Sequence, residues 1–363
     1  MRKTIIALAA LLAAPCALAQ SADTQKKWDQ TVAAAKAEGK VVVAGSPDPV
    51  MRKEIIPAFE KRFGIPIEFI AGHSSAITGR ARTERASGIY SIDVYLAGPD
   101  TAYNALYKGG MLDPLAPELI TAEVTDPSKW KMGKPWFVDD DQKYVMRLFN
   151  SVDSWLFINT DYVKPEELKS AKDLLNPKWK GKISTEDPSS NKGAGGAFSA
   201  LYYDQLGADF AKKLYVDQKP TISGDRRQLT DWLARGINPI CLTCRADDVD
   251  ALRKEGFHIE EVYHLDGLKD RLSASPFEME LANKAPHPNA ARVFVNWMAG
   301  KEALTLYSRA AQAATVRTDV DESFLDPRVV PKKGGAYFDD GLPSWRGGPK
   351  PAINAKIGEM LGK

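Results

Sequence analysis

Residues 40–96 alternate between buried strands and amphipathic helices, and this alternation constrains the fold more than any other part of the chain. The run Lys40-Val-Val-Val-Ala-Gly45 is apolar without polar alternation, which is typical of a parallel strand covered on both faces. The order is strand 40–45, helix 51–63, strand 65–70, helix 77–87 and strand 92–96. This β-α-β-α-β pattern predicts an α/β fold.

A short loop of small and polar residues follows each of these three strands. In an open parallel sheet the carboxyl ends of the strands share one edge, and ligands bind outside it. We therefore expect the three loops to lie along one ligand-binding edge, although loops after strands are commonly polar for other reasons. The loops are residues 46–49, 71–75 and 97–101.

A second stretch with this organisation is residues 184–198. A short strand at residues 183–185 leads into a loop rich in Ser, Asn and Gly, and helical spacing begins at Ala197. Bare backbone N–H groups and hydroxyls at a helix N-terminus suit an anion or an oxygen-rich ligand. The competing interpretation is an ordinary strand-to-helix turn in which glycine supplies conformational freedom.

The N-terminus reads as a secretory signal peptide. Arg2 and Lys3 precede an apolar stretch too short to span a bilayer, and Ala17-Leu-Ala19 is a small-x-small cleavage pattern. We expect cleavage after Ala19 and a periplasmic product. Lipid attachment at Cys16 is the alternative, but Pro15 occupies the preceding position, where a small residue is needed.

Length and charge limit the possible classes of protein. The chain has 363 residues and a formal net charge of +2, which falls to zero when Arg2 and Lys3 are removed with the leader. More than 300 residues exceed one ordinary core, so we expect two domains. A neutral chain without a basic tract gives no reason to expect nucleic acid or a membrane surface as a partner.

After Cys16, the only cysteines are Cys241 and Cys244. No second cysteine pair accompanies them, and the four histidines lack metal-ligand spacing. In an oxidising compartment we expect a local disulfide. Two free buried thiols, and redox or metal chemistry, are the alternatives.

Several segments resemble the type 2 periplasmic solute-binding proteins of ABC importers (extracellular solute-binding family 1). The similarity is greatest to the branch of ferric-ion, phosphonate and polyamine binders. The segments that carry the resemblance are Ala58-Phe-Glu-Lys-Arg-Phe-Gly-Ile-Pro-Ile67, Ser91-Ile-Asp-Val-Tyr95, residues 173–183 and residues 287–303. The resemblance spans roughly residues 40–318 and specifies the family, not the ligand.

The resemblance implies a two-lobe α/β fold, each lobe a mostly parallel sheet flanked by helices, with two hinge strands joining the lobes. A receptor of this kind traps a small solute between its lobes and delivers it to an inner-membrane ABC permease. We expect a monomer without a cofactor. The implied parts are a signal peptide (1–19), lobe one (20–149 and 276–318), lobe two (150–275) and a C-terminal tail (319–363) that packs on the body.

The same resemblance implies solute contacts on the strand-end loops of both lobes. The predicted contacts are Ser46, Asp48, His73, Ser74, Ser75, Asp100, Thr101, Ser189, Ser190, Asn191, Arg226, Thr243 and Arg245. Guanidinium groups pair bidentately with carboxylate or phosphate, so the two arginines favour an anionic organic solute. Surface ion pairs with nearby aspartates are the alternative role for them.

Two other functions are weighed against this one. Ferric-ion binders of this fold carry adjacent tyrosines where this chain has Thr243-Cys-Arg245, so we expect no metal site. An exported hydrolase would need a nucleophile or metal motif, and the chain has no Gly-x-Ser-x-Gly pattern. We therefore expect a binding protein that is not an enzyme.

Overall fold

The structure is a computed structural model that describes residues 7–190 and 193–363, with side chains from residue 23 onward except that of Asp247. The chain forms two compact units, which we call unit 1 (Met1–Ser151 and Ala274–Val330) and unit 2 (Val152–Ser273 and Pro331–Lys363). The chain therefore passes between the units three times. The sequence led us to expect two passages, because the tail after residue 319 gave no sign of dividing at residue 330.

The main sheet of unit 1 has the strand order β2-β1-β3-β14-β6-β5, and β4 pairs with β14. Strands β1, β2 and β3 are parallel, as predicted, whereas β14 runs antiparallel to both β3 and β6. The sheet is therefore mixed rather than mostly parallel. The strands are β1 (Val41–Gly45), β2 (Ile67–Ala71), β3 (Val94–Ala97), β4 (Leu112–Asp113), β5 (Trp136–Phe137), β6 (Val145–Arg147) and β14 (Glu278–Ala282).

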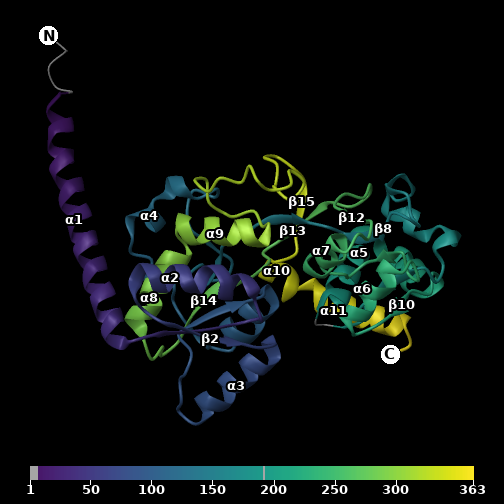
Figure 1. Cartoon of the computed structure of the whole chain (residues 1–363), viewed down its shortest axis with the longest axis horizontal. Helices are drawn as coiled ribbons and strands as arrows, with labels where there is room; N and C mark the ends of the chain where they lie inside the picture. The colour runs from purple at the N-terminus through teal and green to yellow at the C-terminus, as the bar shows by residue number, and fades with distance from the viewer. Residues whose placement is uncertain (1–6, 191–192) are drawn as a thin grey trace. The chain divides into compact units, whose positions relative to one another are not determined.

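Helices cover both faces of this sheet. One face packs in a large apolar core beneath α2, α8 and α9, and a smaller core on the other face includes residues of α3 and η2. Figure 1 shows α2, α8 and α9 on one side of the strands and α3 on the other. The helices and turns of unit 1 are α1 (Ala7–Glu38), η1 (Met51–Ile55), α2 (Ile56–Phe63), α3 (Ser74–Ala86), η2 (Thr101–Tyr107), η3 (Ala116–Glu118), α4 (Ala122–Thr125), η4 (Pro127–Lys129), α8 (Pro288–Met298) and α9 (Lys301–Ala311).

Strand β14 is central to the sheet, yet the sequence did not reveal it. Its first residues read Glu278-Met-Glu280, an alternation that is typical of a half-exposed strand or a loop. In the structure, however, Glu278 and Glu280 are 1% and 0% exposed. Two carboxyl groups are thus enclosed in the middle of the unit.

Unit 2 contains a five-stranded mixed sheet of order β10-β9-β11-β8-β12. Strands β9, β10 and β11 are parallel, and β8 is antiparallel to β11 and β12. A second, three-stranded sheet has the order β15-β13-β7. The strands are β7 (Ser151–Asp153), β8 (Leu156–Asn159), β9 (Ile183–Thr185), β10 (Thr221–Ile222), β11 (Ile240–Cys241), β12 (Ile259–Val262), β13 (Asp270–Ser273) and β15 (Tyr337–Asp339).

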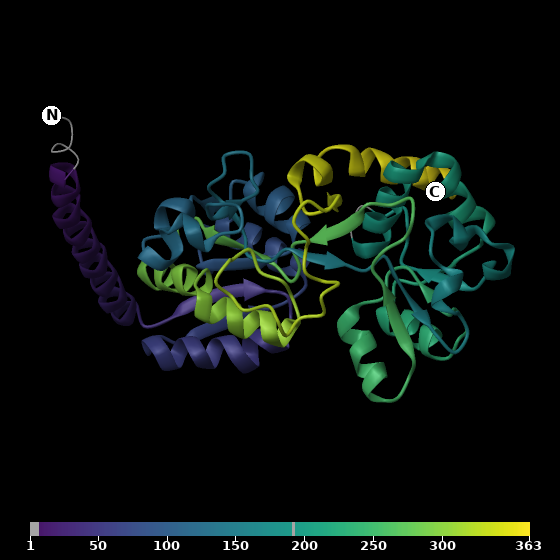
Figure 2. The same ribbon diagram turned by 90° about the horizontal axis from the view of Figure 1, so that it is seen from above.

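The C-terminal residues complete the core of unit 2. Trp345, Ile353 and Ile357 are buried with residues of α5, and Figure 2 shows the yellow α11 alongside the teal α5. The predicted C-terminal tail, in which the sequence indicated only a last short helix at residues 352–361, thus contains a strand and two helices. The helices and turns are η5 (Pro165–Glu167), η6 (Ala171–Leu175), η7 (Pro177–Trp179), α5 (Gly193–Lys212), η8 (Lys213–Asp217), α6 (Arg226–Ala234), α7 (Ala246–Lys254), α10 (Pro343–Arg346) and α11 (Pro349–Met360).

The sequence pattern of residues 165–175 predicts one helix, and this prediction is wrong. These residues form two separate 3₁₀ turns, and the first begins where Glu167 accepts a hydrogen bond from the Lys164 amide. The Ser170 hydroxyl accepts a hydrogen bond from the backbone N–H of Lys172, and Asp173 accepts from that of Ser170. Side chains that bond to the local backbone compete with a continuous helix, which explains the interruption.

Helix α1 joins part of the predicted leader to the start of the mature body. It runs from Ala7 to Glu38, whereas the sequence predicted a helix only from Thr24. Its second half packs against α8, and the Trp28 and Phe63 rings meet edge to face at 6.1 Å. Over the described part of the chain, no helix combines the length and apolar character needed to span a membrane.

Candidate functional site

The strand register of unit 1 aligns the predicted loops along one edge. Gly45 pairs with both Ala71 and Leu96, so β1, β2 and β3 end side by side. The Gly72 amide also donates to the Gly45 carbonyl at 3.0 Å, which draws the second loop toward the first. The strand-end edge predicted from the sequence is therefore present within this unit.

Asp48 belongs to this edge, but its carboxylate serves the fold. Oδ1 accepts from the backbone amides of Val50 at 2.8 Å and Met51 at 3.3 Å, at the entry to η1. Oδ2 accepts the Tyr307 hydroxyl. Burial raises the pKa of Tyr307, and the adjacent Asp48 carboxylate raises it further, so this hydroxyl stays protonated.

His73 caps helix α3 at the second loop. Its Nδ1 lies 2.9 Å from the Ser75 hydroxyl and 3.4 Å from the Ser75 amide, and the ring is exposed. Ser74 is half-buried beside it, and its carbonyl accepts the Thr78 hydroxyl.

The remaining predicted residues of unit 1 lie on the same edge. Ser46 is exposed immediately after β1, and Asp100 and Thr101 are half-buried at the start of η2. The Thr101 amide donates to the Gly98 carbonyl at 2.9 Å, which tightens the third loop. Ser46, Asp100 and Thr101 therefore remain predicted solute contacts on this edge.

The structure adds three side chains that the sequence did not single out. Glu278 of β14 pairs in register with Ala97 of β3 and Arg147 of β6, and Arg147 pairs with Trp136 of β5. The Arg147 guanidinium stacks 4.6 Å from the Trp136 ring and donates to the Phe149 carbonyl. In the sequence, Arg147 is a single charged residue within the apolar run Val145-Met-Arg-Leu-Phe149, which does not mark it as functional.

In unit 2, the loop after β9 is organised by Glu186. Its amide donates to the Thr243 hydroxyl at 2.7 Å, and its Oε2 accepts from the amides of Ala194 at 3.0 Å and Gly195 at 3.3 Å. These amides are in the first turn of α5. The donors that we predicted for an anion are thus bonded to a side chain of the protein.

Ser189 and Ser190 follow in the same loop. The Ser189 hydroxyl donates to Asp187 Oδ1 at 2.7 Å, and Lys363 reaches Asp187 Oδ2 at 2.6 Å. Burial acts to raise the pKa of Asp187, but the hydrogen bonds from Lys363 and Ser189 outweigh it and lower that pKa. Ser189 is therefore bonded to its own loop, and Asn191 lies outside the described residues.

The loop after β11 carries the cysteine pair. Cys241 and Cys244 form a disulfide with an S–S distance of 2.05 Å, the first of the three states that the sequence left open. Thr243 between them is 1% exposed and holds the Glu186 amide. Its side chain therefore supports the neighbouring loop, and we do not retain it among the proposed solute contacts.

Two arginines stand at this edge. Arg226 begins α6, its side chain is 48% exposed, and its Nε lies 3.3 Å from Glu186 Oε1. Arg245 is exposed at the N-cap of α7. Among the side chains described, no group of three or more His, Cys, Asp or Glu residues is placed to hold a metal ion.

Comparison with known proteins defines the class. The model of the family described as bacterial extracellular solute-binding protein matches residues 54–330, which is most of the chain. The chain therefore belongs to this family of binding proteins.

Solved structures with the same fold include periplasmic binding proteins of several specificities. The apo ferric ion-binding protein A of Pasteurella haemolytica has 14% identity and a TM-score of 0.65, over 89% of this chain and 98% of its own. AfuA of Actinobacillus pleuropneumoniae, with fructose-6-phosphate bound, has 17% identity and a TM-score of 0.63, over 89% and 99%. The Trichodesmium protein IdiA (FutA), with iron and citrate, has 18% identity and a TM-score of 0.62, over 89% and 98%. The fold is therefore that of two-lobe periplasmic binding proteins.

Proposed function

We propose that the protein is the periplasmic receptor of an ABC importer and binds a small polar organic solute that carries a negative charge. The Arg226 and Arg245 side chains at the strand-end edge of unit 2 are the observation that carries this proposal. A guanidinium group recognises carboxylate and phosphate through paired hydrogen bonds. In this proposal the protein acts as a monomer, the leader is cleaved after Ala19, and an inner-membrane permease receives the solute.

The solute contacts proposed on unit 1 are those at the ends of β1, β2 and β3. Ser46, His73 and Ser75 are exposed there, and Ser74, Asp100 and Thr101 are half-buried. Their hydroxyl and imidazole groups supply neutral donors and acceptors for a polar solute. Binding without chemical conversion is sufficient for the proposed role.

The fold neighbours bind anionic solutes as well as iron, since one holds fructose-6-phosphate and another holds iron with citrate. Ferric ion remains the alternative cargo. Hard Fe³⁺ needs several oxygen ligands gathered at one point, and no group of three or more His, Cys, Asp or Glu side chains placed to hold a metal ion occurs among the described residues. These observations support an organic anion over the bare metal.

Calorimetric titration with organic carboxylates, phosphonates and sugar phosphates tests the proposal, and native mass spectrometry of the purified protein identifies any retained solute. We expect at least one anion to bind, and Arg245→Ala to weaken it by about tenfold or more. Lys254→Ala, at the far end of α7, is the control for the loss of one positive charge. Binding of polyamines or ferric ion, with no organic anion bound, would reject the proposal.

A further inference from the structure

Glu186 is an acidic side chain at the strand-end edge of unit 2 that the sequence did not mark as functional. It directly follows β9, and its side chain is only 14% exposed. Both of its carboxylate oxygens have partners, and the partners differ in kind. Oε2 accepts from the Ala194 and Gly195 amides, while Oε1 faces Arg226.

These partners are the donors through which an anion would be recognised here. Backbone amides of a first helical turn and a guanidinium group both favour negative charge. In the structure, the Glu186 carboxylate already accepts from both amides and lies 3.3 Å from Arg226 Nε. An incoming carboxylate or phosphate therefore competes with Glu186 for these three donors.

The glycines of the loop fit this interpretation. A Cβ atom at Gly193 would lie 2.8 Å from Glu186 Oε2, and one at Gly195 would lie 2.4 Å from the Asp187 carbonyl oxygen. The small residues thus make room for the Glu186 carboxylate and for the tight loop around it. The glycine-rich loop after β9, which suggested a ligand site in the sequence, therefore encloses the Glu186 carboxylate instead.

We propose that Glu186 determines specificity by acting as an internal competitor for anions. This inference rests on the proposed function, in which a solute anion reaches Arg226. Replacing one carboxylate by another at the same donors yields little net free energy, so the solute must gain affinity through further contacts. A small inorganic anion makes few such contacts and is rejected.

The test compares wild-type protein with Glu186→Gln by calorimetric titration with inorganic phosphate and sulfate. The Gln side chain keeps an oxygen that can accept from Ala194 but removes the negative charge beside Arg226. We expect phosphate to bind Glu186→Gln about tenfold more tightly than wild type, the effect of one lost charged competitor. We expect the double variant Glu186→Gln and Arg226→Ala to lose this gain in phosphate affinity.

Glu166→Gln is the matched control, because it makes the same change of charge on an exposed residue in the segment after β8, at the opposite end of the sheet. Circular dichroism and the unfolding midpoint without ligand verify that each variant folds. Should Glu186→Gln misfold, Glu186→Asp takes its place. Its shorter side chain weakens the same contacts but keeps the negative charge, so we expect a smaller gain in phosphate affinity.

The outcomes separate this inference from the proposed function. If wild type binds an organic anion and Glu186→Gln has unchanged phosphate affinity, the role of Glu186 is overturned and the receptor proposal stands. If Glu186→Gln gains phosphate affinity but no organic anion binds wild type, the choice of cargo is overturned instead. If neither protein binds any anion, both are rejected.

Discussion

Nη1 of Arg271 lies 2.8 Å from Oδ2 of Asp340, and both side chains are buried. Nη2 of the same guanidinium lies 2.7 Å from Asp153 Oδ2, and its carbon lies 4.3 Å above the Phe198 ring. This arginine of β13 thereby joins β7, the C-terminal segment and the start of α5 within unit 2. The ion pair holds part of the segment that we expected to be a C-terminal tail packing on the body.

Asp340→Asn should destabilise the protein by about 3 kcal/mol, because the buried Arg271 guanidinium then lacks one of the carboxylates that neutralise its charge. Urea unfolding followed by tryptophan fluorescence measures the loss, since Trp155 and Trp345 are buried in the same unit. Asp217→Asn, an exposed aspartate of unit 2, is the control. A similar midpoint for both variants would show that the pair contributes little.

Glu280→Gln should stabilise the protein at neutral pH. Burial raises the pKa of Glu280 well above its ordinary value, and the neighbouring Glu278 carboxylate raises it further. The folded state therefore holds a proton that the unfolded state releases as the pH rises above about 4.5. The stability that this proton confers is complete below that pH and is lost as the pH approaches the folded-state pKa.

Urea titrations at pH 4 and pH 7 measure this difference. We expect Glu280→Gln to exceed wild type by about 1 kcal/mol at pH 7, and the two proteins to converge at pH 4. Glu255→Gln on the surface should follow wild type at both values. If Glu280→Gln is less stable than wild type at pH 7, the charged carboxylate of Glu280 stabilises the folded state, and the prediction is wrong.

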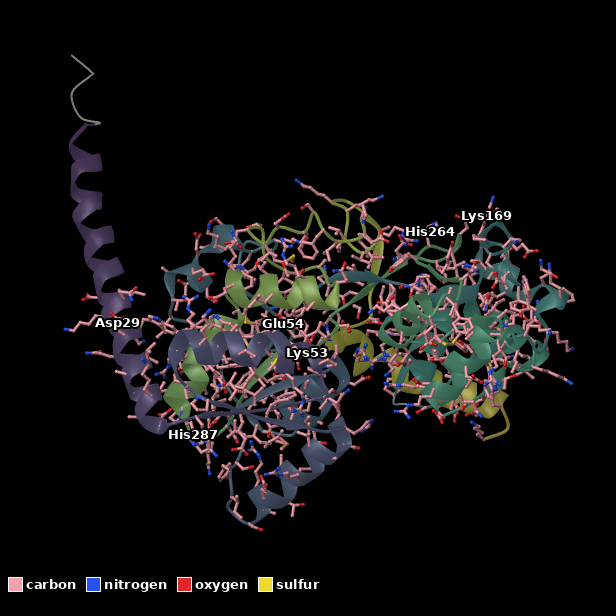
Figure 3. All side chains as sticks on the ribbon, viewed as in Figure 1. Asp29, Lys53, Glu54, Lys169, His264 and His287 are labelled. Carbon is pink, nitrogen blue, oxygen red and sulfur yellow. A yellow bond between two sulfur atoms is a disulfide. The ribbon has the colours of Figure 1, made fainter. Side chains whose placement is uncertain are left out.

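His264 should titrate above its ordinary range. The hydrogen bond that His264 Nδ1 donates to Asp270 Oδ1, at 2.7 Å, raises the pKa of His264, and Asp266 raises it further against the effect of burial. His264 and Lys169, both labelled in Figure 3, lie on loops joined by the bond from the Asp266 amide to the Lys169 carbonyl. The protonated ring thus links acidic groups at this junction.

An NMR titration of the His264 ring tests this effect. The stabilisation is complete below the ordinary pKa of about 6.5 and is lost as the pH rises through the higher folded-state value. Asp270→Asn should lower the His264 midpoint, whereas Asp204→Asn should leave it in place. An unchanged midpoint in Asp270→Asn would assign the shift to another group.

Asn354→Ala should loosen the loop that contains Glu186. The Asn354 amide, which is 0% exposed, donates to the Gly196 carbonyl at 2.8 Å and lies 3.4 Å from the Ser199 hydroxyl. Removing this donor takes away one hydrogen bond to a buried carbonyl that the Ser199 hydroxyl also contacts at 3.3 Å, and it costs about 1 kcal/mol. Helix α11 therefore supports the start of α5.

Hydrogen exchange of residues 193–200 reports on this support locally. We expect faster exchange there in Asn354→Ala, with unchanged exchange in the β1–β3 region of unit 1. Glu359→Ala on the exposed face of α11 is the control. Equal exchange in both variants would show that α11 does not restrain the loop.

Local patterns accounted for much of the fold. Strands β1, β2 and β3 and helices α2 and α3 each carry an apolar pattern that their own residues specify, so the sequence predicted them within a few residues. Strand β14 was missed, because a central strand with Glu278 and Glu280 contradicts the usual pattern. Its neighbours, not its own residues, decide that it is buried.

The strand-end edges could also be predicted from the sequence, because the carboxyl ends of parallel strands lie at one edge of a sheet. The hydrogen-bond partner of each side chain on those edges could not be predicted. Asp48 meets Tyr307 across more than 250 positions of sequence, and Glu186 meets Thr243 across 57. No local pattern reports such distant pairings.

The sequence by itself determined the order of strands and helices from β1 to β3, the candidate edge loops and the resemblance to solute-binding proteins. Only the tertiary structure decided which polar groups remain available at those edges. It assigned the Ala194 and Gly195 amides to Glu186 and the Asp48 carboxylate to η1 and Tyr307. The reason is physical: a partly buried donor or acceptor must find a partner, and the folded chain determines which one lies within reach.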